Sequence, residues 1–358
     1  MRLKEYPTII LDTIPKLYER QINVFITHLY GIEAQVERLP KKFCKMYTTQ
    51  PLANQLLEYL GSRGANISSE DFHIVPEGKP FSIRLSDGKR LEIMLCAGNV
   101  LANSLMLLIR RLRGGRLLYY YSAVQQDDLN YLMGNTTFQE WIALGTEELL
   151  LNLQAAHQPF DHIDFEQIAE QISKFFKDND KVPVIEVPQF GYELLIRKLA
   201  ETSALFGHIK LLDSFVKSYR CLTSDLRYFH RSGYTISLAV NHKSSINIHN
   251  SEISYPLSKL KWSPVPNRIN LIQICSLLRP LHISGIVGYH EKGNVTPVPE
   301  FLKNFKCSNA IVSKTQVIQE SVEIKLCPTK RRRDYENEPI LFTKSKKLAY
   351  VDDDDDIN

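Results

Sequence analysis

Alternating apolar and polar positions mark paired strands in the first half of the chain. Residues 81–85 carry apolar side chains at every second position, and residues 91–95 resume the alternation after an Asp87-Gly88 pair. Period-two alternation predicts strands with one buried face, and Asp-Gly favours the tight turn of a hairpin. A second hairpin is expected within residues 105–121, where two apolar runs flank a Gly-Gly pair. The first half is therefore predicted to be rich in strands.

Short buried strands and helices complete the first half. The β-branched runs at 8–11 and 23–27 are typical of buried strands. Apolar residues recur at helical spacing in 51–60 and again in 146–153, which predicts a helix in each segment. Hairpins mixed with helices favour a sheet core that is covered by helices.

From about residue 160 the pattern changes to an alternation of strands and helices. Strand–helix–strand order is typical of parallel α/β structure. The expected elements are helices at 165–176, 192–202 and 269–278, and strands at 182–187, 209–212 and through 286–287.

Composition narrows the class of protein. Of the 358 residues, 44% are hydrophobic and 23% are charged, which are the values of a globular chain and exclude a disordered or fibrous one. No stretch approaches 18 uninterrupted apolar residues, so we expect no transmembrane helix and no membrane partner. The six cysteines show no Cys-x-x-Cys spacing, which favours reduced thiols over a disulfide framework or a zinc finger. The net charge of +4 is too small to indicate nucleic-acid binding by itself.

The C-terminal segment carries two basic clusters ahead of an acidic end. Ten residues separate the clusters, and this is the spacing of a bipartite nuclear import signal, although a solvated charge run is the alternative. We therefore expect localisation to the nucleus, with a nuclear import receptor as a partner. The five aspartates at 352–356 repel one another and are expected to be solvated. The basic residues are Lys330, Arg331, Arg332, Arg333, Lys344, Lys346 and Lys347.

Several short segments, in order along the chain, resemble the Apollo/Artemis family of DNA cross-link repair nucleases. Glu-Tyr-Pro-Thr-Ile-Ile-Leu-Asp at 5–12 looks like the opening strand of that family, and Val-Phe-Ile-Thr-His at 24–28 looks like the strand leading into its metal-binding loop. No single segment is specific, and the weight of the resemblance lies in the order and spacing of all of them. The further segments lie at 51–57, 95–106, 117–119, 135–138, 191–195 and 262–265, so that the resemblance spans roughly residues 5–290.

The resemblance implies a fold and a domain organisation. The fold class is mixed α+β and α/β: a four-layer αββα metallo-β-lactamase fold with an inserted α/β domain of the β-CASP type. Residues 1–158 would form the first metallo-β-lactamase-like part and residues 159–250 the β-CASP-like insert. Residues 251–303 would return to the first domain, and 304–358 would be a largely disordered tail with basic clusters and an acidic end.

The family cleaves phosphodiesters with one or two zinc ions, and nearly all of the implied ligand positions are substituted here. In the His-x-His-x-Asp-His loop, His28 keeps the first position, while Tyr30, Ile32 and Glu33 replace the second His, the Asp and the last His. Amides, hydroxyls and apolar side chains are poor zinc ligands, so we expect no metal and no other cofactor. The β-CASP acid is retained as Glu193. The remaining degenerate positions are Asn99, Ser122, Asn135 and Val265, with Val100 as the alternative to Asn99.

Two groups of cations are candidates for contact with nucleic acid. Arg227 and Arg231 alternate with aromatic residues, a mixture suited to phosphate contact and base stacking. Ordinary exposed charge on a basic protein is the alternative for both groups. The other group, around the second hairpin, comprises Arg110, Arg111, Arg113 and Arg116.

These observations favour a pseudonuclease over an enzyme. The sequence predicts a nuclear protein of DNA interstrand cross-link repair or telomere protection, which has lost the metal site and binds DNA or docks repair or telomere proteins. One alternative is an active 5′–3′ exonuclease with rearranged ligands, which would require zinc. A second alternative is an interaction scaffold without nucleic-acid affinity. Salt-dependent DNA binding would distinguish the DNA-binding pseudonuclease from this scaffold.

Overall fold

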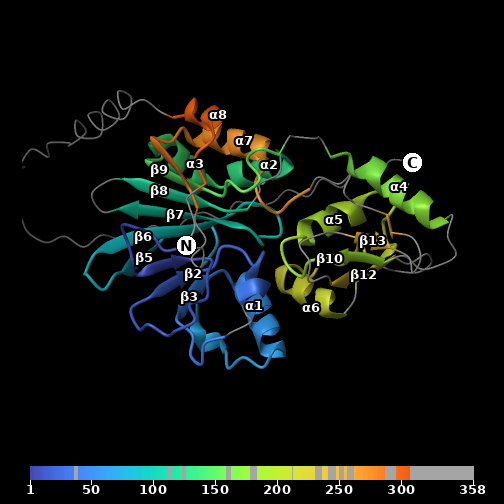
Figure 1. Cartoon of the computed structure of the whole chain (residues 1–358), viewed down its shortest axis with the longest axis horizontal. Helices are drawn as coiled ribbons and strands as arrows, with labels where there is room; N and C mark the ends of the chain where they lie inside the picture. The colour runs from blue at the N-terminus through green and yellow to red at the C-terminus, as the bar shows by residue number, and fades with distance from the viewer. Residues whose placement is uncertain are drawn as a thin grey trace, which may run out of the picture. The chain divides into compact units, whose positions relative to one another are not determined.

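The computed structural model has mixed α/β architecture, as expected from the sequence (Figure 1). It describes residues 1–35, 39–111, 115–122, 126–158, 163–177, 184–211, 213–229, 236–240, 247–249, 254–255, 262–286 and 296–306. All of these lie in a compact unit, Met1–Val312, and the C-terminal unit, Ser313–Asn358, falls outside the described residues. Within the described part, no helix combines the length and the apolar character needed to span a bilayer.

A six-stranded sheet forms the centre of the first half and contains both predicted hairpins. Four strands between residues 81 and 120 pair antiparallel with their neighbours, and the two hairpin turns join the first two of them and the last two. Two further strands, at 148–151 and 282–285, extend the sheet in parallel. The two hairpin predictions are therefore confirmed. The strand order is β15 (His282–Gly285), β9 (Glu148–Leu151), β8 (Arg116–Tyr120), β7 (Leu105–Arg111), β6 (Arg90–Ala97) and β5 (Phe81–Arg84).

A smaller, fully parallel sheet packs against one face of the six-stranded sheet. The two strands that the β-branched runs predict are short and buried, while the other two expose part of their residues. The buried side chains of the sheet join those of the larger sheet in one hydrophobic core. The order is β1 (Ile9–Leu11), β2 (Asn23–Phe25), β3 (Lys45–Thr48) and β4 (Phe72–Ile74). Short 3₁₀ helices, Ile32–Gln35 and Ser69–Asp71, connect these strands.

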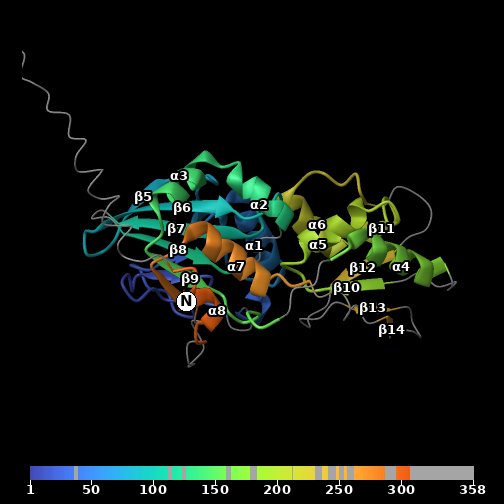
Figure 2. The ribbon, with the colours of Figure 1, turned by 90° about the horizontal axis from the view of Figure 1, so that it is seen from above.

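Helices cover the outer sides of the two sheets. A second hydrophobic core, which includes Trp141, Phe138 and Leu271, lies between the six-stranded sheet and a helical layer that Figure 2 shows from above. Helix α1 (Gln50–Ser62), which begins with a proline in its first turn, lies beside the smaller sheet. The helical layer on the larger sheet consists of α2 (Gln126–Met133), α3 (Thr136–Leu144), α7 (Arg268–Leu278) and α8 (Glu300–Lys303).

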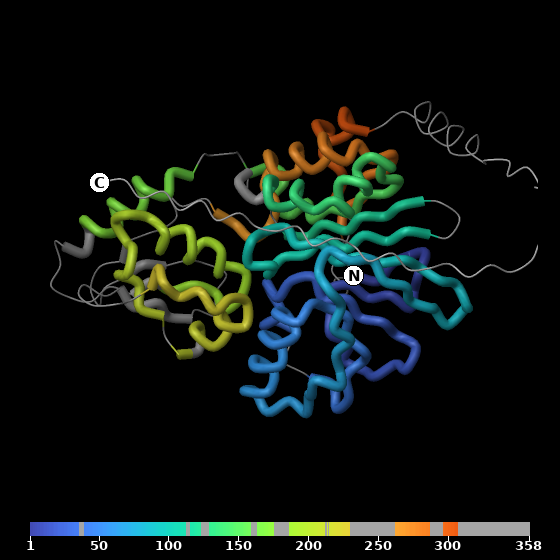
Figure 3. Tube along the Cα trace, turned by 180° about the vertical axis from the view of Figure 1, so that it is seen from behind, coloured from blue at the N-terminus to red at the C-terminus, as the bar shows by residue number. Residues whose placement is uncertain are grey.

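The segment between residues 163 and 255 builds a third sheet with its own core. Strands β11, β12 and β10 are parallel, which confirms the predicted strand–helix–strand alternation. Phe215, Tyr219 and Leu195 are fully buried in this core. Helix α1 lies alongside α6 (Asp213–Leu222), as Figure 3 shows from behind, and the side chain of Gln55 donates a hydrogen bond to the hydroxyl of Ser218. The elements are α4 (Phe165–Lys177), β10 (Val184–Val187), α5 (Glu193–Glu201), β11 (Ile209–Leu211), α6 (Asp213–Leu222), β12 (Ile236–Val240), β13 (Asn247–His249) and β14 (Ser254–Tyr255).

One predicted helix is wrong. Residues 146–153 were expected to be helical, yet β9 (Glu148–Leu151) is a strand hydrogen-bonded in parallel to both β8 and β15. Three consecutive leucines buried on both faces of a sheet carry no alternation, and a short apolar run of this kind also fits one turn of a buried helix. The segment is a strand because it is hydrogen-bonded on both sides to β8 and β15, which are distant in the sequence.

Candidate functional site

Residues from five distant segments meet at one small cavity of about 20 Å³. His28 follows β2, Asn99 follows β6 and Ser122 follows β8, so that each stands just beyond the end of a strand. The cavity has room for about one water molecule. Four of the sequence-predicted positions, His28, Tyr30, Asn99 and Ser122, line it. The other lining residues are Asn103, Ser104, Gly191, Leu194, Trp262 and Pro264.

Asp12 anchors the loop that carries His28. Its carboxylate accepts hydrogen bonds from the backbone N–H of Thr27 at 2.6 Å and from the Thr27 hydroxyl at 2.7 Å. Nε2 of His28 lies 3.4 Å from Oδ2 of Asp12. Burial acts to raise the pKa of Asp12, but the imidazole of His28 and the bonds from Thr27 outweigh it, so that this pKa lies below its ordinary value. The carboxylate is therefore ionised in the buried core, beneath the cavity.

His28 itself is held flat and buried. Its ring stacks on Tyr121 with 4.0 Å between the ring centroids, and its backbone bridges to Ser104 in antiparallel fashion. Only 6% of the residue is exposed, and neither ring nitrogen has a hydrogen-bond partner among the described residues, although Nε2 faces the carboxylate of Asp12. The ring is thus positioned mainly by packing and by the charge of that carboxylate.

Two aromatic side chains, Tyr30 and Trp262, line the cavity, and Tyr192 packs against both from behind the lining. The ring of Tyr192 lies 6.2 Å from that of Tyr30 and 5.2 Å from that of Trp262. Gly191, with φ of +90°, fits between them because a Cβ atom there would lie 3.0 Å from Tyr30 and 3.3 Å from Pro264. This aromatic cluster joins the segment before α5 to the segment before α7.

A buried network around Glu193 ties the aromatic cluster to the two sheets. One carboxylate oxygen of Glu193 accepts from the side-chain amide of Asn103 at 3.0 Å and from the backbone N–H of Gly191 at 2.8 Å. The other accepts from Gln55 of α1 at 3.2 Å. Asn99 extends the network by donating to Asn103 at 2.9 Å. Glu193 is thus a buried hydrogen-bond acceptor that holds Asn103, and through it Asn99, at the cavity.

Two buried carboxyl groups lie near each other beside this network. Burial raises the pKa of Glu193, and the hydrogen bonds that it accepts only partly oppose the rise. Burial also raises the pKa of Glu33, and the negative charge of Glu193 adds to that effect. Glu33 lies in the 3₁₀ helix Ile32–Gln35, which follows the His28 loop. Neither carboxyl group lines the cavity.

Three predicted positions stand away from the cavity lining. Ile32 is packed in the core of the two sheets, and Val265 is buried next to the lining residue Pro264. Asn135 caps the N-terminus of α3, where its side-chain oxygen accepts from the N–H of Phe138 at 3.1 Å. An N-cap is a role that asparagine fulfils as well as aspartate does.

The donors gathered at the cavity do not fit a zinc ion. Zinc requires three or four nitrogen, sulfur or carboxylate ligands within about 2.0–2.3 Å. The cavity offers one imidazole together with amides, hydroxyls and an indole, and the amide of Asn99 is already bonded to Asn103. In the part of the chain that the structure describes, no group of three or more His, Cys, Asp and Glu side chains is placed to hold a metal. The prediction that the protein carries no zinc remains a prediction.

The arginines of the second hairpin are engaged in internal contacts. Arg111 pairs with Glu5 at 2.8 Å and with Glu147 at 3.4 Å, and Arg116 donates to the backbone carbonyl of Leu144. Arg110 forms an exposed pair with Glu92 at 3.6 Å. Arg113 lies outside the described residues. For Arg111 and Arg116, these contacts support a role in holding the ends of the central strands β7 and β8 to the neighbouring segments.

We expect Arg111→Gln to destabilise the protein by about 1–2 kcal/mol, because three carboxylates would lose their shared counter-charge at a site with 21% exposure. Arg110→Gln is the matched control on the neighbouring position, and its exposed pair predicts a change within about 0.5 kcal/mol. Urea denaturation followed by circular dichroism measures both. Equal losses in the two variants would contradict the structural role of Arg111.

The second predicted cationic group is partly described. The guanidinium of Arg227 lies over the ring of Tyr228 at 4.8 Å and also pairs with Asp225 at 3.1 Å. Phe206, which is 45% exposed, packs edge-on against Tyr228 at 5.9 Å. Exposed aromatic and guanidinium groups in this arrangement are suited to base stacking. Arg231 and the basic clusters Lys330, Arg331, Arg332, Arg333, Lys344, Lys346 and Lys347 lie outside the described residues.

Several residues that shape the site are not among the predicted site positions. Asp12, Gln55 and Asn103 belong only to the wider segments of the resemblance, although Asp12 directly ends a buried apolar run, which is a recognisable signal. Gln55 and Asn103 reach Glu193 from 138 and 90 residues away, and no local pattern marks such contacts. Trp262 was noted as part of a segment and is now seen to line the cavity.

Comparison with known proteins leaves the family of this chain open. No protein-family model matches it, and no curated protein matches it. Among solved structures it is similar to the isothiocyanate hydrolase from Delia radicum gut bacteria, with 14% identity and a TM-score of 0.24 over 42% of this chain. The chain spans 59% of the length of that protein, and a likeness of this size carries no argument about function.

Proposed function

We propose that this chain is a divergent relative of the Apollo/Artemis nucleases that has kept the scaffold, lost the metal site and acts by binding DNA or docking partners in the nucleus. In this proposal the two facing sheets and their helices correspond to the metallo-β-lactamase part, and the third sheet corresponds to the β-CASP insert.

One observation carries the proposal. His28 and Tyr30 from one metal-binding motif of the resemblance, Asn99 from a second and Ser122 from a third line the same cavity, although they lie far apart in the sequence. A chance alignment of weak motifs gives no reason for such positions to converge. The segments at 191 and 262–264, assigned to the insert and the return from it, reach the same cavity.

The chemistry of the cavity favours a non-catalytic role. Phosphodiester hydrolysis at neutral pH needs an activated water and neutralisation of the charge that develops on the phosphate. The donors at the cavity do not fit a zinc ion, and its one imidazole already faces the carboxylate of Asp12. DNA binding in turn rests on the net positive charge, on the exposed Arg227 and Phe206 and on the half-buried Tyr228 between them.

Fluorescence anisotropy with a labelled single-stranded DNA tests the binding part of the proposal. We expect the affinity to fall as salt rises, because phosphate contacts release counterions. Arg227→Gln should weaken binding and reduce the slope of log K against log salt by about 1. Lys303→Gln removes the same charge from α8, where Lys303 pairs with Glu300, and should leave both quantities unchanged.

Two results would contradict this reading. If the labelled DNA does not bind even at low salt, the protein does not bind nucleic acid and the interaction scaffold is favoured. Equal losses in the Arg227 and Lys303 variants would mean that net charge alone, rather than the Arg227–Tyr228 surface, supports the binding.

A further inference from the structure

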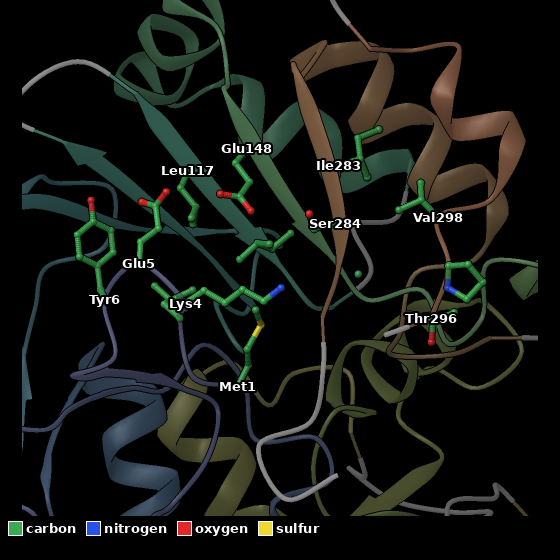
Figure 4. Close-up of a pocket in the computed structure, with 14 residues that line it drawn as sticks. Met1, Lys4, Glu5, Tyr6, Leu117, Glu148, Ile283, Ser284, Thr296 and Val298 are labelled. Atoms are coloured by element: carbon green, nitrogen blue, oxygen red, sulfur yellow. The ribbon is translucent and has the colours of Figure 1, made fainter. Parts of the chain in front are cut away.

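A second cavity, which shares no lining residue with the one at His28, lies at the inner face of the six-stranded sheet. It has a volume of about 420 Å³ and opens to solvent (Figure 4). This volume lies within the range of sites that hold small organic ligands. Its walls come from β8, β9 and β15, from residues 1–6 and from residues 296–298.

Small side chains at the sheet edge create this cavity. Ser284 of β15 stands in register with Leu150 of β9, and both face the side on which residues 1–6 pass. The N-terminal segment is held beside β1 by the Arg2–Ile10 bridge, so it cannot close onto β15. Because β15 places the small Ser284 beside Leu150 and ends in Gly285, the space above Leu117 and Leu150 stays unfilled. The floor is therefore apolar and preformed.

One end of the cavity carries acidic groups in excess of the cations that face them. Glu5 lies 2.8 Å from Arg111, whereas Glu148 lies 3.8 Å from the same guanidinium, which also serves Glu147. Burial raises the pKa of Glu148, and the negative charge of Glu5 adds to the rise. The carboxylate of Glu148 is thus only partly compensated, at the point where the polar end meets the apolar floor.

The chain itself places a cation in this cavity. Lys4 lines the cavity, and Figure 4 shows its side chain extending between the N-terminal segment and β15. Lys4 is exposed, and its flexible stem can turn to solvent without loss of backbone contacts. When the Lys4 side chain turns to solvent, the ammonium group of a ligand can occupy the same part of the cavity.

We propose that this cavity binds a small amphiphilic amine, with its aliphatic body on Leu117, Leu150 and Ile283 and its ammonium group at Glu148. The charge around the cavity favours a cation over an anion, because the three carboxylates of Glu5, Glu147 and Glu148 share only Arg111 and Lys4 as cations in the described part of the chain. Met1 also lines the cavity, but burial lowers the pKa of its α-amino group to about 6, so this group is mostly uncharged at neutral pH. The aliphatic floor requires a ligand with an apolar body. This site is separate from the proposed DNA-binding function, and neither proposal depends on the other.

Titration of the full chain with n-hexylamine, hexanoate and hexanol tests the proposal. Methyl NMR shifts of Leu117, Leu150 and Ile283 report where each probe binds and with what affinity. We expect hexylamine to bind more tightly than hexanoate. Glu148→Gln should weaken hexylamine binding about tenfold, since a charge-assisted hydrogen bond is lost, and should leave hexanol binding unchanged. Glu92→Gln, an exposed carboxylate on the same sheet, is the matched control.

A second variant separates the two possible charges of the ligand. Lys4→Met removes the competing ammonium group, so it should leave hexylamine binding unchanged or strengthen it. Tighter binding of hexanoate, abolished by Lys4→Met, would overturn the proposal, and so would the absence of methyl shifts with all three probes. Ser284→Leu should fill the cavity and abolish hexylamine shifts in a chain whose thermal unfolding remains cooperative.

Discussion

Replacement of Asp12 by alanine is expected to destabilise the protein by about 3–5 kcal/mol, because it leaves the N–H and hydroxyl of Thr27 and the ring of His28 buried without their shared acceptor. The backbone adds to this loss. Asp12 has φ of +48°, a conformation that alanine adopts at a cost of about 1 kcal/mol. Urea denaturation monitored by tryptophan fluorescence measures the free energy of unfolding.

Two further variants divide the effect of Asp12 into its parts. Asp12→Gly accepts the positive φ but lacks the carboxylate, so it should recover only the backbone share of the loss. Asp12→Asn keeps the backbone preference and one acceptor oxygen, and should be the mildest of the three. If alanine and glycine both cost less than about 1 kcal/mol, the carboxylate does not anchor the His28 loop.

The pH dependence of the asparagine variant follows from the lowered pKa of Asp12. A carboxyl group with a lower pKa in the folded state stabilises that state above its unfolded pKa of 3.8, and the contribution is lost as pH falls through the folded value. The stability difference between the native chain and Asp12→Asn should therefore be constant from pH 8 to about 5 and shrink below about 4. A difference that grows in acid would contradict the assignment.

Glu193→Ala is the second change with a large expected effect. It leaves the amide of Asn103 and the backbone N–H of Gly191 without their acceptor in a fully buried place, at about 1–3 kcal/mol each, and it opens a void beside α5. Relief of the buried charge offsets part of this loss, since burial raises the pKa of Glu193. We expect a net loss of about 2–4 kcal/mol in thermal or urea unfolding.

A matched control for Glu193 lies on the same helix. Glu201 pairs with Arg197 near the surface at 2.7 Å, and Glu201→Ala should cost less than about 0.5 kcal/mol. Glu193→Gln keeps the volume but replaces one acceptor oxygen by an NH2 group, so at least one of the N–H donors that face it loses its acceptor, and the variant should also be destabilised. A glutamine variant as stable as the native chain would mean that Glu193 is not held as an acceptor.

Local patterns in the sequence were sufficient to predict the mixed α/β class and several of its elements. The hairpin of β5 and β6 and the alternation from α4 to β11 follow from periodicity and turn residues, whereas helices α2, α3 and α6 were not predicted. Strand β9 could not be predicted, because Glu148–Leu151 has no period of its own and takes its conformation from β8 and β15. The period of a segment is informative only where one face is exposed.

The site was predictable in part. His28, Tyr30, Asn99 and Ser122 were selected from short motifs, and the structure brings them to one cavity. The roles of Glu193 and Arg111 were not predictable, because a charged residue in a sequence carries no sign of whether it faces a solvent-filled groove or an internal partner. The 420 Å³ cavity arises from small side chains on β15, and it too has no counterpart in any local pattern.

The zinc content of the purified full chain decides whether the protein is a pseudonuclease that has lost its metal site or an active exonuclease. Mass spectrometry measures it, and a digestion of labelled 5′-phosphorylated DNA is run beside it. We expect no stoichiometric zinc and intact DNA, with the same result after added zinc. Near-stoichiometric zinc together with processive digestion, abolished by His28→Ala in a chain that still unfolds cooperatively, would contradict this expectation and identify the protein as an active exonuclease.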